Sequence, residues 1–234
     1  MDNPIILALD VPEAEAALKL VKELAGSVGA FKIGKELFTA AGPDLVRRIR
    51  ATGASVFLDL KFHDIPNTVA KAVASSVRLD VQMLTIHTSG GSEMMRAAEQ
   101  SAQETASKLG LPVPLVLGVT VLTSMDNKGL AEIGIDIDAA AQVERLAQLA
   151  AKSGLRGLVC SPLEITRLRS VIPPTMQLVT PGIRPADSVK DDQKRTMGPR
   201  EAIQAGANWL VIGRPIYAAA NPKAAAEAIL ASLS

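Results

Sequence analysis

The sequence has few aromatic residues and a single cysteine, and both shortages limit what it can form. Aromatic side chains account for 3% of the 234 residues and hydrophobic side chains for 48%, so the core must consist mainly of Ala, Val, Ile and Leu. Such a composition is typical of a parallel sheet covered by alanine-rich helices. The lone Cys160 lies in the apolar run GLVCS, which excludes a disulfide framework and indicates a reducing compartment.

An excess of one charge, long apolar runs and nucleotide-fold glycines are also missing. The chain has 25 basic and 24 acidic residues and no long basic run, so we expect no nucleic acid partner, while a nucleotide-sized ligand remains open. No apolar run is long enough to span a membrane, and the first is too short for a signal peptide, which predicts a cytoplasmic protein with no membrane partner. No Gly-x-Gly-x-x-Gly follows the first apolar run, which argues against a dinucleotide-binding sheet.

Short apolar runs alternate with amphipathic stretches along the whole chain. Glu13–Ala25 has apolar residues at helical spacing, the stretch Met94–Gly110 ends in a typical helix stop, and a last helix is expected over Pro222–Leu233. Eight strand–helix pairs without a linker predict one domain over residues 1–234, a (β/α)8 TIM barrel, with a doubly wound open sheet as the alternative. The predicted strands are Ile5–Leu9, Ala30–Ile33, Ser55–Leu60, Val81–His87, Leu115–Thr120, Gly157–Ser161, Gln177–Thr180 and Trp209–Gly213.

Two connections are longer than a minimal loop. One is Thr123–Ala139. The other, residues 181–196, is polar and contains Gly, two prolines and three aspartates. Its composition predicts a mobile loop over a site rather than a linker.

Charged residues gather where the third predicted strand ends, in the stretch DLKFHDIPNT. Barrels carry their active sites at these carboxyl ends of strands. Asp59 and Lys61 point to one side because side chains alternate along a strand, and Lys32 in the neighbouring strand needs a carboxylate partner if it is buried. The three could form a structural ion network that closes the barrel, or an active site whose charges are fixed for chemistry. Asp10 and Asp64 could instead cap the helices that follow them.

A phosphate site is indicated after the seventh and eighth strands, where many barrels bind phosphate. The loops there read TPGIRP, with Gly182 and Arg184, and VIGRP, with Gly213 and Arg214. Glycine lets backbone N–H groups approach phosphate oxygens, and arginine offers a bidentate charged contact.

With Asp59-x-Lys61-x-x-Asp64 followed by DIPNT, the sequence resembles the orotidine 5′-phosphate decarboxylase family. Further segments agree in family order: LALD, FKIG, VTVLTS, TPGIRP and VIGRPI, at the first, second, fifth, seventh and eighth strands. The resemblance covers essentially the whole chain. It implies a carboxy-lyase that converts orotidine 5′-phosphate into UMP, the last step of de novo pyrimidine nucleotide biosynthesis, without a metal or other cofactor.

The resemblance also implies roles for individual residues. Lys61 would protonate C6 of the pyrimidine as CO2 leaves, with Asp59 near the substrate carboxylate. Lys32, Asp59, Lys61 and Asp64 would form an alternating array, and Asp64 and Thr68 would reach into the neighbouring site of a homodimer. The substrate contacts it implies are Asp10 and Lys32 at the ribose, Thr123 at the pyrimidine, Gln193, Gly213 and Arg214 at the phosphate, and Arg184 in the gripping loop.

Three other functions compete with this interpretation. Magnesium-dependent 3-keto-L-gulonate 6-phosphate decarboxylases share the Asp-x-Lys-x-x-Asp motif, but they carry an acidic residue where this chain has Lys32. Phosphate-binding isomerases and epimerases would explain the last two loops and not the Lys–Asp array. A barrel that binds a nucleotide and regulates something else is the non-enzyme alternative.

Overall fold

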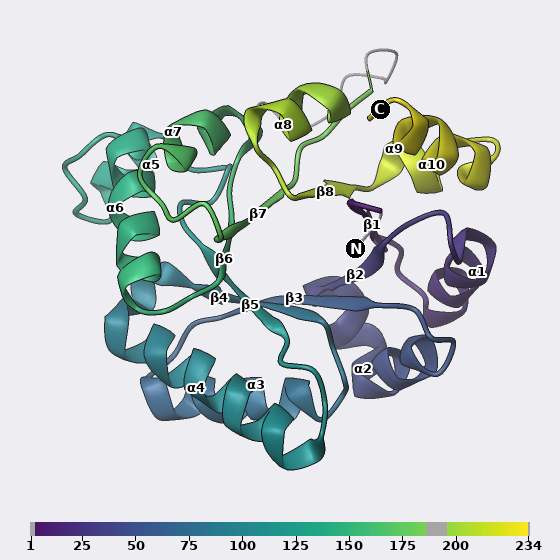
Figure 1. Cartoon of the computed structure of the whole chain (residues 1–234), viewed down its shortest axis with the longest axis horizontal. Helices are drawn as coiled ribbons and strands as arrows, with labels where there is room; N and C mark the ends of the chain where they lie inside the picture. The colour runs from purple at the N-terminus through teal and green to yellow at the C-terminus, as the bar shows by residue number, and fades with distance from the viewer. Residues whose placement is uncertain (1–2, 186–195, 234) are drawn as a thin grey trace.

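The protein is described by a computed structural model that covers residues 3–185 and 196–233. In these ranges eight parallel strands form a closed barrel in the order β1 to β8. Figure 1 shows the strands around the centre and the helices outside them. The predicted (β/α)8 TIM barrel is therefore confirmed, and the alternative of an open sheet is wrong. The strands are β1 (Ile5–Ala8), β2 (Ala30–Gly34), β3 (Val56–Phe62), β4 (Met83–His87), β5 (Leu115–Val119), β6 (Gly157–Val159), β7 (Gln177–Thr180) and β8 (Trp209–Ile212).

All eight strands lie where they were predicted, with ends that differ by at most two residues. The largest differences, of two residues each, are at β3, which continues to Phe62, at β4, which begins at Met83 instead of Val81, and at β6, which ends at Val159 instead of Ser161. β3 is longer because extended pairing with β4 resumes at Phe62, beyond the charged residues that seemed to end the strand.

Helices follow the strands and cover the outside of the barrel (Figure 1). Their apolar residues face inwards: α1, for example, buries Ala17, Val21 and Leu24 on one side. The helices are α1 (Ala14–Leu24), α2 (Lys35–Arg50), α3 (Pro66–Val77), α4 (Gly91–Leu109), α5 (Asn127–Glu132), α6 (Ala139–Lys152), α7 (Ile165–Arg169), α8 (Pro199–Ala205), α9 (Arg214–Tyr217) and α10 (Pro222–Ala231), with short 3-10 turns η1 (Thr88–Gly90) and η2 (Pro162–Glu164). No helix within the described ranges is long and apolar enough to cross a bilayer.

Two local sequence signals can be compared with the structure. The predicted helix stop is confirmed, since α4 ends at Leu109 and its C-cap, Gly110, takes the left-handed φ of 64°. The connection Thr123–Ala139 is more ordered than a loop, because it contains α5, whose first turn is capped by Asp126 through a 2.9 Å bond from the Gly129 N–H.

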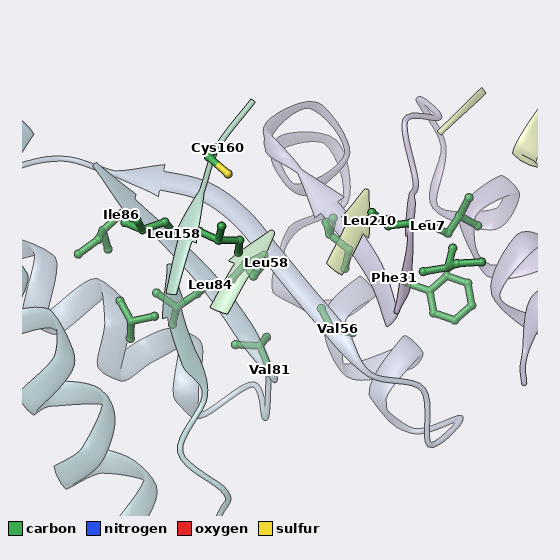
Figure 2. Close-up of a cluster of buried hydrophobic side chains, with 14 of the residues drawn as sticks. Leu7, Phe31, Val56, Leu58, Val81, Leu84, Ile86, Leu158, Cys160 and Leu210 are labelled. Atoms are coloured by element: carbon green, nitrogen blue, oxygen red, sulfur yellow. The ribbon is translucent and has the colours of Figure 1, made fainter. Parts of the chain in front are cut away.

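The core has two layers, one inside the barrel and one between the barrel and the helices. Alternate strand residues point to the two layers. Figure 2 shows the outer layer, to which Leu7, Phe31 and Leu58 contribute from three neighbouring strands. The inner layer is small: Ile6, Ala8, Ala30, Phe57, Met83, Leu117, Val179, Trp209 and Val211.

The inner layer leads directly to the charged residues. On β2 the inward position after Ala30 is Lys32, and on β3 the inward position after Phe57 is Asp59. The apolar filling of the barrel is therefore replaced by a layer of charge at the carboxyl ends of these strands.

Candidate active site

Four charged side chains, from β2, from β3 and from the segment just after β1, meet at the carboxyl end of the barrel. Lys32 Nζ lies 3.2 Å from Asp10 Oδ1 and 3.9 Å from Asp59 Oδ2, and Lys61 Nζ lies 2.8 Å from Asp59 Oδ1. The side chains of Lys32 and Asp59 are 12% and 13% exposed and that of Lys61 is 25% exposed, so water screens these contacts only partly. The predicted meeting of Lys32, Asp59 and Lys61 is confirmed, and Asp10 extends the array by one carboxylate.

Lys61 reaches Asp59 for a different reason from the one that regular strand alternation suggested. The ladder between β3 and β4 pairs Leu58 with Leu84 and Phe62 with Ile86, so three residues of β3 stand opposite one residue of β4. Within this bulge Lys61 has φ of 54°, a left-handed conformation that is uncommon for a residue other than glycine. The bulge turns the Lys61 side chain back towards the carboxylate two residues before it.

The charged surroundings keep the Asp59 carboxylate ionised. Burial raises its pKa, but the Lys61 and Lys32 ammonium groups lower it, as do hydrogen bonds from Lys61 and Thr85, and the net pKa lies below its usual value of 3.8. Asp59 therefore carries its negative charge at neutral pH, next to two cations.

Two adjoining cavities open beside this array, and Lys32, Asp59 and Lys61 line both of them. The first has a volume of ≈ 200 Å³ and a mainly apolar wall that includes Phe57, and Thr123 also lines it. The second, of ≈ 220 Å³, has several charged residues in its wall, Asp10 among them, together with Leu9 and Leu37. An apolar pocket beside a polar one fits a ligand with a flat ring at one end and hydroxyl groups at the other.

Cys160 also lines the first cavity, but only 3% of the residue is exposed. Burial raises the pKa of its thiol to about 12, in spite of a contact with the Thr180 hydroxyl. A thiol in this state is a poor nucleophile, so Cys160 forms part of the wall.

The residues predicted for phosphate binding lie at the ends of β7 and β8. Gly213 precedes α9, which begins at Arg214, and a methyl group on Gly213 would lie 3.5 Å from Asp10 Oδ2. The β8 loop thus lies next to the charged array. After β7, Gly182 has φ of 82°, and the N–H of Arg184 donates to the Met197 carbonyl at 3.0 Å, which joins the two ends of the 181–196 connection. Gln193 and residues 186–195 lie outside the described residues, so the predicted mobile loop stays a prediction.

Asp64 and Thr68 do not join the array within one chain. Both are exposed, and Asp64 Oδ1 accepts a hydrogen bond from the Ile65 N–H at 2.6 Å. Within the part of the chain that the structure describes, no ion pair links Asp64 to a lysine of the array.

Helix capping does not explain either of the aspartates for which it was an alternative. The N-cap of α3 is Ile65, and no side chain caps that helix. The N-cap of α1 is Glu13, three residues beyond Asp10. Asp10 instead faces Lys32, and Asp64 is left pointing to solvent next to Ile65, which is 66% exposed.

Sequence reasoning missed several residues of the site. Thr85, in the middle of β4, hydrogen bonds to Asp59 and to the backbone of Lys61, and Ser161 lines the first cavity. Threonine is common in strands, so nothing in the run MLTIH marked it. In residues 3–185 and 196–233 no three His, Cys, Asp or Glu side chains cluster in a way that could hold a metal ion.

Known proteins resemble this chain in sequence and in fold. Residues 3–229 match the model of the family described as "Orotidine 5′-phosphate decarboxylase / HUMPS family". Orotidine 5′-phosphate decarboxylase of Opitutus terrae is 55% identical over 229 residues, which are 98% of this chain and 97% of that protein. The enzyme of the same name from Pseudomonas syringae pv. syringae is 51% identical over 232 residues, which are 99% of this chain and 98% of that protein. The crystal structure of orotidine 5′-phosphate decarboxylase from Lactobacillus acidophilus superposes with a TM-score of 0.88 at 38% identity, covering 99% of each chain. The chain therefore belongs to the orotidine 5′-phosphate decarboxylase / HUMPS family.

Proposed function

We propose that this protein is a carboxy-lyase that converts orotidine 5′-phosphate into UMP and CO2, the final step of pyrimidine nucleotide synthesis. Curated relatives at 51–55% identity carry this activity in their names. The observation that carries the proposal is the position of Asp59, which contacts the ammonium groups of both Lys32 and Lys61 beside an apolar cavity.

In the proposed reaction the pyrimidine loses one bond and gains one. The bond between C6 of the pyrimidine and the carboxylate breaks, CO2 departs, and the electron pair stays on C6. Lys61 then donates a proton from its ammonium group to C6, which gives UMP, and the lysine regains a proton from water. An ammonium held in place by a 2.8 Å contact needs no reorganisation as the negative charge develops, which favours stabilisation of the transition state.

Asp59 has two effects in this scheme. It holds Lys61 in position, and it places a negative charge near the carboxylate of the substrate. Two like charges ~4 Å apart repel by roughly 4 kcal/mol at an effective dielectric constant near 20, and this repulsion disappears as CO2 leaves. We give more weight to the fixed positive charge, because preorganised electrostatics is the larger contribution in most enzymes.

The remaining residues are proposed to bind the substrate away from the bond that breaks. Binding energy gained at the phosphate can exclude water and align the ring with Lys61. The proposed contacts are Asp10 and Lys32 with the ribose, Thr123 with the pyrimidine, Gln193, Gly213 and Arg214 with the phosphate, and Arg184 in the connection beyond β7.

A homodimer with shared sites is part of the proposal. Asp64 and Thr68 are exposed at the start of α3, beside the exposed Ile65, and so are available to a second copy of the chain. In the proposed dimer Asp64 adds a carboxylate to the neighbouring array next to Lys61.

The alternative functions make different demands on the site. A magnesium-dependent sugar-phosphate decarboxylase needs carboxylates around its metal, but Lys32 occupies the inward position of β2 and its ammonium would repel a divalent cation. A regulatory nucleotide-binding protein has no need of two lysines and two aspartates in contact at the barrel mouth, since partly burying such charges is unfavourable without a chemical role.

Turnover of orotidine 5′-phosphate tests the proposal directly. We expect EDTA-treated protein to convert the substrate, as followed by the change in pyrimidine absorbance and by chromatographic detection of UMP. Lys61→Ala should abolish turnover while the protein stays folded, and Lys152→Ala, which removes an exposed lysine of α6, should leave turnover unchanged.

Each other outcome points to a different function. Tight UMP binding without turnover favours the regulatory protein. Turnover that depends on added Mg²⁺, with a sugar phosphate as substrate, favours the metal-dependent decarboxylases. Appreciable kcat in Lys61→Ala contradicts the proton-donor role of this lysine.

A further inference from the structure

Thr85 connects the two residues to which the proposed chemistry is assigned. It lies in β4, is completely buried, and its hydroxyl stands between Asp59 and Lys61. The Lys61 N–H donates to Thr85 Oγ1 at 2.8 Å, and the Thr85 hydroxyl donates to Asp59 Oδ1 at 3.0 Å. The same Asp59 oxygen accepts from Lys61 Nζ at 2.8 Å. These three hydrogen bonds form a ring that holds Lys61 at both its backbone and its ammonium group.

The ring occurs at the irregular point of the barrel. Between the pairs Leu58–Leu84 and Phe62–Ile86, Thr85 is the single residue of β4 that faces the bulge of β3. The bulge removes the Lys61 N–H from the regular ladder, and the Thr85 hydroxyl takes the place of the missing carbonyl acceptor. A left-handed φ of 54° is strained for a lysine, and such a conformation persists only where its surroundings hold it.

We propose that Thr85 is a positioning residue for the decarboxylation, which holds the Lys61 backbone in its left-handed conformation and directs Asp59 Oδ1 at the Lys61 ammonium. This inference rests on the proposed function. Valine has the shape of threonine without its hydroxyl, so Thr85→Val removes the ring and leaves the packing nearly intact. The Lys61 N–H then lacks its acceptor, and Asp59 loses one of its two hydrogen bonds.

Turnover and substrate binding should respond differently to this change. Because Thr85 touches the groups assigned to bond breaking and to protonation, we expect Thr85→Val to lower kcat about tenfold or more while KM changes by less than about threefold. Thr85→Ser keeps the hydroxyl and should restore most of kcat. Thr88→Val is the matched control, because it removes another buried hydroxyl of the same region, which donates to the Val119 carbonyl and not to the array.

The ionisation of Asp59 gives a readout that does not need turnover. The Thr85 hydrogen bond is one of the contacts that lower the Asp59 pKa, together with the charges of Lys61 on its own strand and Lys32 on β2, and His87 of β4 also interacts with Asp59. The carboxyl resonance of Asp59, titrated by carbon NMR, should therefore move to higher pH in Thr85→Val and stay in place in Thr85→Ser and Thr88→Val.

Several results would overturn the inference. It is wrong if Thr85→Val leaves both kcat and the Asp59 titration unchanged. It is also wrong if Thr88→Val loses as much kcat as Thr85→Val, because that result would indicate general damage to the fold. If Thr85→Val does not fold, Thr85→Ala removes the same hydroxyl with a smaller side chain that leaves room for a water molecule, and the same comparisons apply. A wild-type protein that fails to turn over orotidine 5′-phosphate rejects the proposed function instead, and the NMR titration still decides whether Thr85 positions Asp59.

Discussion

Removing the central carboxylate of the array should destabilise the protein as well as inactivate it. Asp59 is the negative group between two ammonium groups, at 2.8 Å and 3.9 Å. In Asp59→Asn the side chain keeps its size but loses its charge. Lys61, 25% exposed, then faces a neutral amide, while Lys32, 12% exposed, keeps Asp10 at 3.2 Å. The change is unfavourable because the Lys61 ammonium loses its 2.8 Å carboxylate partner and the Lys32 ammonium keeps only one of its two.

The size of the effect follows from the geometry. Coulomb attraction amounts to about 6 kcal/mol for the nearer pair and about 4 kcal/mol for the farther one at an effective dielectric constant near 20, and desolvation of the three groups offsets most of it. Because all three side chains keep some contact with water, we expect the lower end of the range for broken buried pairs, about 3 kcal/mol in the free energy of unfolding. For a chain of this length that corresponds to a Tm lower by about 6–12 °C.

The dependence on pH separates this electrostatic effect from a loss of packing. The pKa of Asp59 in the folded protein lies below 3.8, so its charge contributes stability that is complete above pH 3.8 and is lost as the pH falls through the folded-state pKa. The difference in unfolding free energy between wild type and Asp59→Asn should therefore be full at pH 7 and shrink in acid.

Urea unfolding followed by circular dichroism, at equal protomer concentrations from pH 7 downwards, measures this difference. Asp80→Asn is the matched control: Asp80 pairs with Arg50 at 2.6 Å outside the site, is more exposed at 35%, and has a φ of 56° that asparagine accepts easily. It should cost about 1 kcal/mol or less. The reasoning is refuted if Asp59→Asn is as stable as wild type, or if its deficit does not decrease with falling pH.

Three further predictions concern the core, the phosphate and the dimer. Phe57→Ala leaves a cavity in the inner layer, where this residue is 1% exposed, and should lower the free energy of unfolding by about 3–5 kcal/mol in the same urea assay. A loss below about 1 kcal/mol would mean that the barrel interior collapses around the cavity. Arg214→Ala should weaken UMP binding about 10- to 100-fold in calorimetry and leave uridine binding nearly unchanged, and an unaltered KM for orotidine 5′-phosphate would contradict a phosphate contact. A mixture of Asp59→Ala and Asp64→Ala proteins should regain activity after subunit exchange, because one of the two hybrid sites is intact, and no recovery in proven heterodimers would exclude shared sites.

Much of the fold could be predicted from the sequence because its signals are local and repeated. Each short apolar run followed by an amphipathic stretch indicates one strand–helix unit, and the absence of a linker leaves a closed barrel as the simplest arrangement. Charged residues at strand ends could also be placed together, because parallel strands bring their carboxyl ends to one edge of the sheet. Lys32 and Asp59 lie next to each other, as that argument required.

The part that could not be predicted depends on contacts between distant segments. Nothing local in the sequence indicates that β3 gains a bulge at Lys61, because the bulge arises from its register against β4. The role of Thr85 follows from that register and from its position opposite Asp59, and its residue type alone carries no signal. The same applies to the wall of the first cavity, which draws on six strands or the loops after them, from Lys32 to Val211.

The buried thiol of Cys160 has a practical consequence for experiments on subunit exchange. With a pKa of about 12, only roughly one molecule in 10,000 carries a thiolate there at pH 8, so maleimides and alkylating reagents should leave the wild-type protein unlabelled. A cysteine introduced at an exposed position, such as Ser107→Cys near the end of α4, would then be the one site that a fluorophore modifies. Donor and acceptor dyes attached in this way to two preparations would report the mixing of protomers through energy transfer, in a protein that needs no prior removal of its own cysteine.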